Sequence, residues 1–263
     1  MLQNAKEEKG FLNGKLYPGV LNLLVAPGAV GKTTYAYYLS LKFVEETGKG
    51  MIYFSPEETQ WSTKLKLKNL VNFYQNLKKP LEQRKLKIVN QYITFITKRM
   101  GEITTTPALK RLTEIISTND IGMIVLDPVL NFISNVNEND MIREAINKIL
   151  DTISQRNIVL LGIYHTNKDY QTIATIKQEY GGKDASKIDS KHVDALTETV
   201  RGSAEVVNVA RIVYFMLSDT KIPNKQKIIT IKSNISRKGI VIDTFNLPFQ
   251  DQENYERYCY DRL

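Results

Sequence analysis

The sequence predicts an α/β fold: a mostly parallel central sheet flanked by helices, with antiparallel strands added near the C-terminal end. Several apolar runs do not alternate with polar residues, which is typical of strands buried on both faces. Segments with helical spacing separate these runs and supply the crossovers that parallel strands need. After residue 210 three strand candidates follow one another closely with turn residues between them, which favours antiparallel pairing.

Each element can be placed on the sequence. The strand candidates of the parallel sheet are the apolar runs at 21–26, 51–55, 122–127 and 157–165, with a weaker one near Ile93–Ile96. The helix candidates lie at 31–46, at 60–80, from Pro107 onward and at 139–154. The late strands are expected at 211–217, 227–232 and 239–245. Residues 166–200 are polar with few apolar anchors, so we expect a long connection without regular structure there.

Composition narrows the class of protein. The chain has 263 residues and no repeat or linker that divides it, so we expect a single domain over 1–263 with its core at about 15–245. The single cysteine, Cys259, excludes an internal disulfide framework, and a reducing, cytoplasmic location is the default. No apolar run reaches the roughly 18 residues of a membrane helix, and the N-terminus lacks the apolar segment of a secretory signal. The net charge of +8 suits an anionic partner such as nucleic acid, although many basic proteins have none.

The motif that carries chemistry lies at 26–33, between the first strand candidate and the first long helix. It fits the phosphate-binding P-loop pattern G-x-x-x-x-G-K-[ST], except that Ala26 stands in place of the first glycine. Backbone N–H groups of such a loop surround the phosphates of ATP, Lys32 reaches the β- and γ-phosphates, and the Thr33 hydroxyl binds Mg²⁺. The expected nucleotide-binding residues are Pro27, Gly28, Ala29, Val30, Gly31, Lys32, Thr33 and Thr34.

Polar residues at the ends of other strand candidates extend this site. Asp127 ends an apolar run, where a carboxylate would hold the Mg²⁺ shell. Glu57 and Glu58 follow the strand at 51–55, which the usual topology places beside the P-loop strand, and either could orient the attacking water. His165 ends a third buried run, where it could sense the γ-phosphate.

These segments together resemble a known family. APGAVGKTT, YFSPEE, GMIVLDP, LLGIYHTNK and VRGSAEVVNVAR are similar to the RecA-like P-loop ATPase core, above all that of plasmid RepA-type hexameric helicases and more loosely that of DnaB-like helicases. The resemblance covers about residues 15 to 245. It implies a RecA-like fold without the separate N-terminal primase-binding domain of DnaB-like proteins.

The resemblance also implies roles for single residues. Glu57 matches the catalytic glutamate and His165 the sensor. Arg211 matches an arginine finger that acts on a neighbouring subunit's nucleotide, with Arg201 and Lys232 as further basic candidates, and each of the three could equally be a solvated surface charge. A finger acting in trans implies a ring, as in the hexameric relatives.

Two regions could contact single-stranded DNA. Residues 166–200 would line a ring's channel, but their charges nearly balance. Residues 64–99 are richer in lysine and arginine, which could face DNA or only solvate a surface. The favoured hypothesis is a hexameric Mg²⁺-dependent ATPase and helicase that translocates on single-stranded DNA in replication. The alternatives are a RecA-fold ATPase that is no helicase (a recombination mediator, helicase loader or signalling ATPase) and a nucleotide-gated assembly protein.

Overall fold

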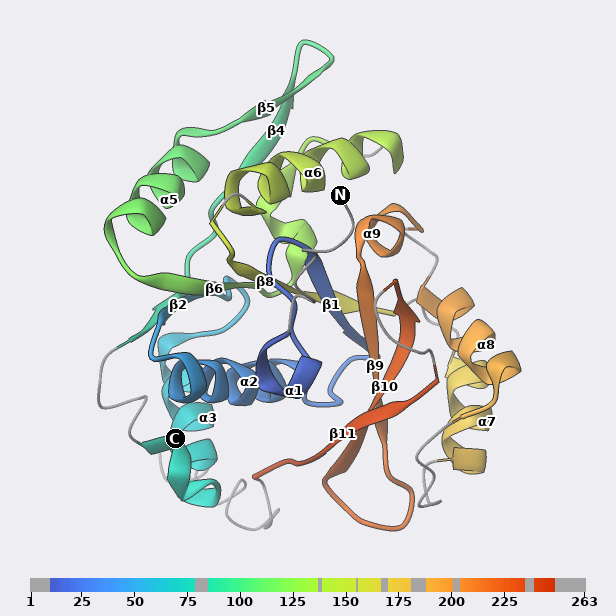
Figure 1. The fold of residues 1–263 in the computed structure, drawn as a ribbon. Helices are drawn as coiled ribbons and strands as arrows, with labels where there is room; N and C mark the ends of the chain where they lie inside the picture. Colours follow the sequence, from blue (N-terminus) through green and yellow to red (C-terminus); the bar gives the residue numbers. More distant parts are fainter. Residues whose placement is uncertain are drawn as a thin grey trace, which may run out of the picture.

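The computed structural model describes residues 10–78, 85–136, 139–154, 156–166, 170–180, 188–200, 204–234 and 239–248. Its centre is one eight-stranded sheet (Figure 1). The strands are β1 (Leu21–Ala26), β2 (Gly50–Phe54), β3 (Leu86–Val89), β6 (Ile121–Leu126), β8 (Val159–His165), β9 (Ile212–Ser218), β10 (Lys225–Ser233) and β11 (Val241–Asn246). Their order in the sheet is β11-β10-β9-β1-β8-β6-β2-β3. All pairs from β9 to β3 are parallel, whereas β9, β10 and β11 pair antiparallel, which confirms the predicted fold class.

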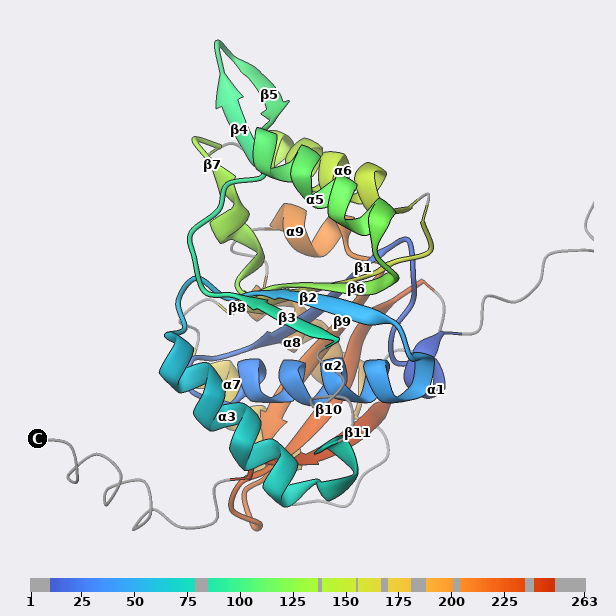
Figure 2. The same ribbon diagram turned by 90° about the vertical axis from the view of Figure 1, so that its left-hand side faces the viewer.

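Helices cover both faces of this sheet, as Figure 2 shows edge-on. One face carries α1 (Phe11–Gly14), α2 (Lys32–Thr47) and α3 (Gln60–Phe73). The other carries α5 (Pro107–Thr118), α6 (Asn139–Ser154), α7 (Tyr170–Tyr180), α8 (Ser190–Val200) and α9 (Ala204–Val209). Each central strand therefore feeds two cores. In β1, Leu23 and Val25 face one core while Leu24 and Ala26 face the other, and all four are fully buried. This double burial is why the strand reads as an unbroken apolar run.

A second, smaller sheet lies above the helices in Figure 1. It consists of β4 (Ile96–Arg99), β5 (Glu102–Thr105) and β7 (Ile133–Ser134), with β4 antiparallel to β5 and parallel to β7. The β4–β5 hairpin stands out from the body of the protein. Its turn uses positive φ angles at Met100 and Gly101, and the Met100 side chain is fully exposed. A 3₁₀ turn, η2 (Val129–Phe132), joins β6 to β7.

The structure corrects the expectation that residues 166–200 lack regular structure, because α7 and α8 lie within this stretch. Each helix buries a narrow stripe at helical spacing: Ile173, Ile176 and Tyr180 on α7, and Val193, Leu196 and Val200 on α8. Three apolar residues per helix in a polar background give a weak periodic signal. Both helices pack on the core of one sheet face, so their described parts contribute to covering the sheet.

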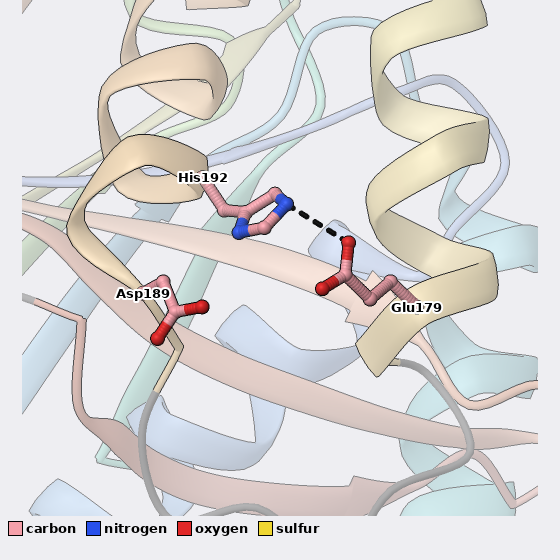
Figure 3. Close-up of side chains that lie close together, drawn as sticks. All are labelled: Glu179, Asp189 and His192. Carbon is pink, nitrogen blue, oxygen red and sulfur yellow. Dashed lines mark ion pairs between the residues drawn. The ribbon is translucent and has the colours of Figure 1, made fainter.

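Polar side chains join these two helices as well (Figure 3). His192 of α8 forms an ion pair with Glu179 of α7, with 2.9 Å between Nε2 and Oε2. The Tyr180 hydroxyl donates to Asp189 at 2.9 Å and lies 3.2 Å from His192 Nδ1. Both nitrogens of the half-ring cluster are thus engaged by side chains of the protein. This arrangement links the end of α7 to the start of α8, which sequence spacing alone did not indicate.

Two smaller expectations also change. The strand expected near Ile93–Ile96 is β4, which starts at Ile96, and β3 precedes it at the edge of the main sheet. The strand at 51–55 was expected beside the P-loop strand. In the structure β8 and β6 separate β2 from β1, so the chain crosses the sheet farther than sequential order suggests.

The basic stretch at 64–99 does not form one continuous surface. Its lysines and arginines are distributed over α3, β3 and the β4–β5 hairpin, and Figure 2 places α3 and the hairpin on opposite sides of the main sheet. Some of these charges already have partners: Lys66 pairs with Glu58, and Lys85 donates to the Gly48 carbonyl. Across the described parts of the chain, no helix is long and apolar enough to cross a membrane.

Candidate functional site

The loop that connects β1 to α2 forms the base of the site. Ala29 and Gly31 both adopt positive φ angles, 60° and 96°, and Gly31 is the N-cap of α2. A Cβ on Gly31 would lie 2.5 Å from Leu247 Cδ2, so glycine is required there for both backbone and space. A Cβ on Gly28 would meet nothing within 4 Å. The loop therefore leaves open space in front of a helix N-terminus, which is favourable for an anion.

Lys32, the first residue of α2, points back into this loop. Its side chain is only 5% exposed, and Nζ donates hydrogen bonds to the carbonyls of Ala26 (2.9 Å) and Pro27 (2.6 Å). Burial lowers the pKa of Lys32 from 10.5 to about 8, against the opposing attraction of Asp127 and Glu57. A buried ammonium held by two carbonyls remains short of negative charge, which a phosphate group would supply.

Asp127 directly follows β6 and faces the start of α2. Its carboxylate accepts hydrogen bonds from the Tyr53 hydroxyl, at 2.7 Å, and from the Thr33 hydroxyl. Burial raises the pKa of Asp127, although these hydrogen bonds and Lys32 act in the opposite direction. Tyr53 is itself fully buried in β2. A carboxylate and a hydroxyl in contact at the edge of the P-loop are hard oxygen donors of the kind that Mg²⁺ prefers, so the residues present fit this ion.

The two glutamates after β2 have different surroundings. Glu58 accepts a hydrogen bond from the Ser62 hydroxyl and forms an ion pair with Lys66, both on α3. Glu57 is exposed, and one of its oxygens, Oε1, accepts a hydrogen bond of 2.9 Å from Asn131 Nδ2. Of the two carboxylates, Glu58 is already neutralised by a cation, whereas Glu57 faces the cavity beside Lys32 with a neutral partner.

His165 ends β8, directly beside Ala26 in the sheet register. Burial lowers its pKa, and the positive charge of Lys32 lowers it further, while Glu57 acts in the opposite direction. The imidazole is therefore neutral at physiological pH, so one ring nitrogen donates a hydrogen bond and the other accepts one.

These groups line one cavity of about 590 Å³. The P-loop side contributes Ala29, Gly31, Lys32, Thr33 and Thr34. Glu57, Glu58, Asp127 and His165 reach it from the ends of three other strands. The remaining wall comes from α3 and from two distant segments: Trp61, Ser62, Leu65, Lys66, Asn224 and Leu247. Of the eight expected nucleotide-binding residues, Pro27, Gly28 and Val30 do not line the cavity, and Pro27 contributes its carbonyl to Lys32.

The basic residues expected to act across an interface lie elsewhere. The Arg211 backbone N–H donates to the carbonyl of Leu21, the first residue of β1, so Arg211 lies at the sheet edge opposite the P-loop. Its side chain is exposed. Lys232 donates to the carbonyls of Val207 and Asn208 in the last turn of α9, and so stabilises that helix end in its own chain. Arg201 lies outside the described residues.

A protein-family model described as an AAA domain matches residues 4–171. The chain belongs to this AAA domain family. Two solved structures are similar to it. The ATPase domain of a helicase is 12% identical with a TM-score of 0.58, over 89% of this chain and 83% of that one. The RadB recombinase is 14% identical with a TM-score of 0.53, over 88% of both chains. No curated protein sequence matches significantly.

At these identities the likeness shows the fold, and together with the family it makes the chain a RecA-like P-loop ATPase core. Three site neighbours were missed from the sequence. Tyr53 and Trp61 read as core and surface aromatics, and Asn131 read as part of a turn. A polar residue four positions after Asp127 was a signal for Asn131, but only the fold brings it to Glu57.

Proposed function

We propose that this AAA domain is a Mg²⁺-dependent ATPase motor, with one core over about 15–245. In this proposal it assembles into a ring, a hexamer by resemblance, and translocates on single-stranded DNA in replication. The observation that carries the proposal is the cavity in which Lys32, Asp127 and Glu57 meet in front of a helix N-terminus.

Nucleotide binding follows from the charges at the cavity. Lys32 would exchange its two carbonyl partners for the β- and γ-phosphates, which also relieves the cost of its burial. Thr33 and Asp127 would hold Mg²⁺, which, when bound, neutralises charge on the phosphate oxygens. The eight residues from Pro27 to Thr34 would surround the phosphates with backbone N–H groups.

Hydrolysis needs a base for water. Glu57 would orient the attacking water and take its proton, because its second oxygen, Oε2, lies free of the Asn131 contact. Glu58 is the weaker candidate because Lys66 and Ser62 already hold its carboxylate. His165, neutral and at the end of β8, would hydrogen-bond the γ-phosphate and respond to its loss.

Assembly is supported by the place of Arg211. β1 has six residues, so its two ends lie roughly 17 Å apart at about 3.4 Å per residue. Arg211 lies at the far end, beyond the reach of an arginine side chain to its own P-loop. It would therefore complete the site of a neighbouring subunit, as would Arg201 if it acts at all. Lys232 is the weakest of the three because it already caps α9.

DNA as the partner rests on less direct support: the net charge of +8, and a recombinase among the similar structures. The RadB likeness also favours a second candidate function, a DNA-dependent ATPase that does not unwind.

The test compares ATP turnover with and without single-stranded DNA, and then the opening of a labelled fork. We expect DNA to raise turnover several-fold and ATP to drive unwinding. Glu57→Gln should bind ATP and stop turnover, while the matched control Glu58→Gln should retain most of it. Stimulation without unwinding would favour the second candidate, and turnover that ignores DNA would overturn both.

A further inference from the structure

Asn131 and Glu57 meet across 74 residues of sequence. Glu57 follows β2, and Asn131 lies on η2, four residues after Asp127. The Asn131 Nδ2 donates to Glu57 Oε1 at 2.9 Å, a good length for this type of bond. An exposed glutamate otherwise samples many rotamers, so a fixed donor on one oxygen restricts where the other oxygen lies.

The backbone that carries Asn131 is firmly anchored. Its N–H donates to the Pro128 carbonyl, at 3.1 Å, which closes the turn of η2. Val129 and Phe132, on either side in η2, are fully buried. The Phe132 ring lies 5.8 Å from the ring of Phe54, the last residue of β2. The element bearing Asn131 is thus packed on the end of the strand that leads to Glu57, and the relative placement of the two is fixed from below.

The contact has little to offer stability. Asn131 is only partly buried and Glu57 is exposed, so breaking their bond leaves both groups open to water. A hydrogen bond of this kind contributes weakly to folding. Its geometric effect is larger, because it engages one carboxylate oxygen with a neutral donor and leaves the other toward the cavity. Glu58 next to it shows the contrast, since an ammonium holds it.

We propose that Asn131 is a positioning residue that holds the Glu57 carboxylate in line for the attacking water. The proposal rests on the catalytic role proposed above for Glu57. Asn131 touches neither phosphate nor water, and it acts through Glu57 alone. Loss of its amide therefore changes the rate of the hydrolytic step and leaves nucleotide binding as it was.

The experiment measures kcat, KM and ATP affinity of the full chain carrying Asn131→Ala. We expect kcat to fall about five- to tenfold, with KM and affinity within about twofold of wild type. Asn131→Asp keeps the size but replaces the donor with a second carboxylate, and should be at least as slow. Asn131→Gln keeps an amide on a longer chain and should recover part of the rate. Ser134→Ala, on the same segment but outside the cavity, should match wild type.

A double-mutant cycle separates positioning from a structural role. In single-turnover measurements, adding Asn131→Ala to Glu57→Gln should change the residual rate less than about twofold. An equal loss in both backgrounds, a loss of ATP affinity, or an unchanged kcat in Asn131→Ala would each overturn the proposal. If Glu57→Gln itself turns over normally, the catalytic assignment of Glu57 fails first. If Glu57→Gln is inactive and Asn131→Ala is normal, only the role of Asn131 fails.

Discussion

Raising the pH should weaken nucleotide binding through a single side chain, Lys32. Its pKa near 8 means that about nine-tenths of the free protein carries the charged lysine at pH 7 and about one-tenth at pH 9. Bound phosphate favours the charged form, so binding above pH 8 must take up a proton. The expected affinity at pH 9 is about tenfold weaker than at pH 7, which corresponds to roughly 1.4 kcal/mol.

Few other groups at the cavity confuse this measurement. A terminal phosphate loses its second proton near pH 6 and is almost fully ionised throughout the range. The lowered pKa of His165 keeps its imidazole neutral from pH 7 upward. Calorimetry at pH 7 and pH 9, in two buffers of different ionisation enthalpy, gives the affinity and the proton uptake together.

The control is Lys32→Arg, whose guanidinium remains charged across this range. It should bind more weakly than wild type, because the cradle is shaped for an ammonium, but with the same affinity at both pH values. Equal wild-type affinity at pH 7 and pH 9, or a pH-dependent Lys32→Arg, would refute the reasoning that the buried ammonium must be charged to bind phosphate.

The same cavity and the opposite sheet edge support four further tests. Burial depresses the pKa of Lys32 in the folded state, so the unfolded chain binds more protons between about pH 8 and 10.5; Lys32→Met should therefore raise the nucleotide-free melting temperature at pH 7, through a gain of at most about 3 kcal/mol, and lose the stabilisation by ATP. Trp61 is the one tryptophan of the chain, half-exposed at the cavity, so ATP should change the intrinsic fluorescence, and a Trp61→Phe chain should give no such signal. Asp127→Asn should abolish Mg²⁺-dependent turnover without lowering the melting temperature, because it removes a buried charge and leaves an oxygen for its hydroxyl partner. Arg211→Ala and Glu57→Gln chains should each be inactive alone but regain turnover when mixed, because the second supplies the arginine that the first lacks; mixtures that stay inactive would contradict action in trans.

The fold was largely readable from the sequence because its central strands are buried on both faces. The runs that became β1, β6 and β8 differ from the expected bounds by about two residues at most, and α6 begins and ends where helical spacing places it. The misses have a physical cause. α7 and α8 each bury only one narrow apolar stripe, and the order of β1 and β2 in the sheet depends on crossovers that local patterns do not encode.

The candidate site divides in the same way. The P-loop and Asp127 are local patterns, a turn before a helix and an acid after a strand, so the sequence predicts where they lie. The contacts of Asn131 with Glu57 and of Tyr53 with Asp127 each join residues 74 positions apart. Such contacts arise from the packing of strand ends, and periodicity carries no information about them.

The separation of Arg211 from the P-loop along β1 has a consequence for stoichiometry. A two-fold dimer places the same patch of both subunits together, so it cannot join an edge that gives an arginine to the opposite edge that receives one. Under the proposed role of Arg211, subunits must therefore meet head to tail. An open row then always ends in one subunit whose nucleotide lacks a donor, and closure supplies that last donor. The ratio of fully assembled sites to chains would distinguish an open row from a closed one without an image of either.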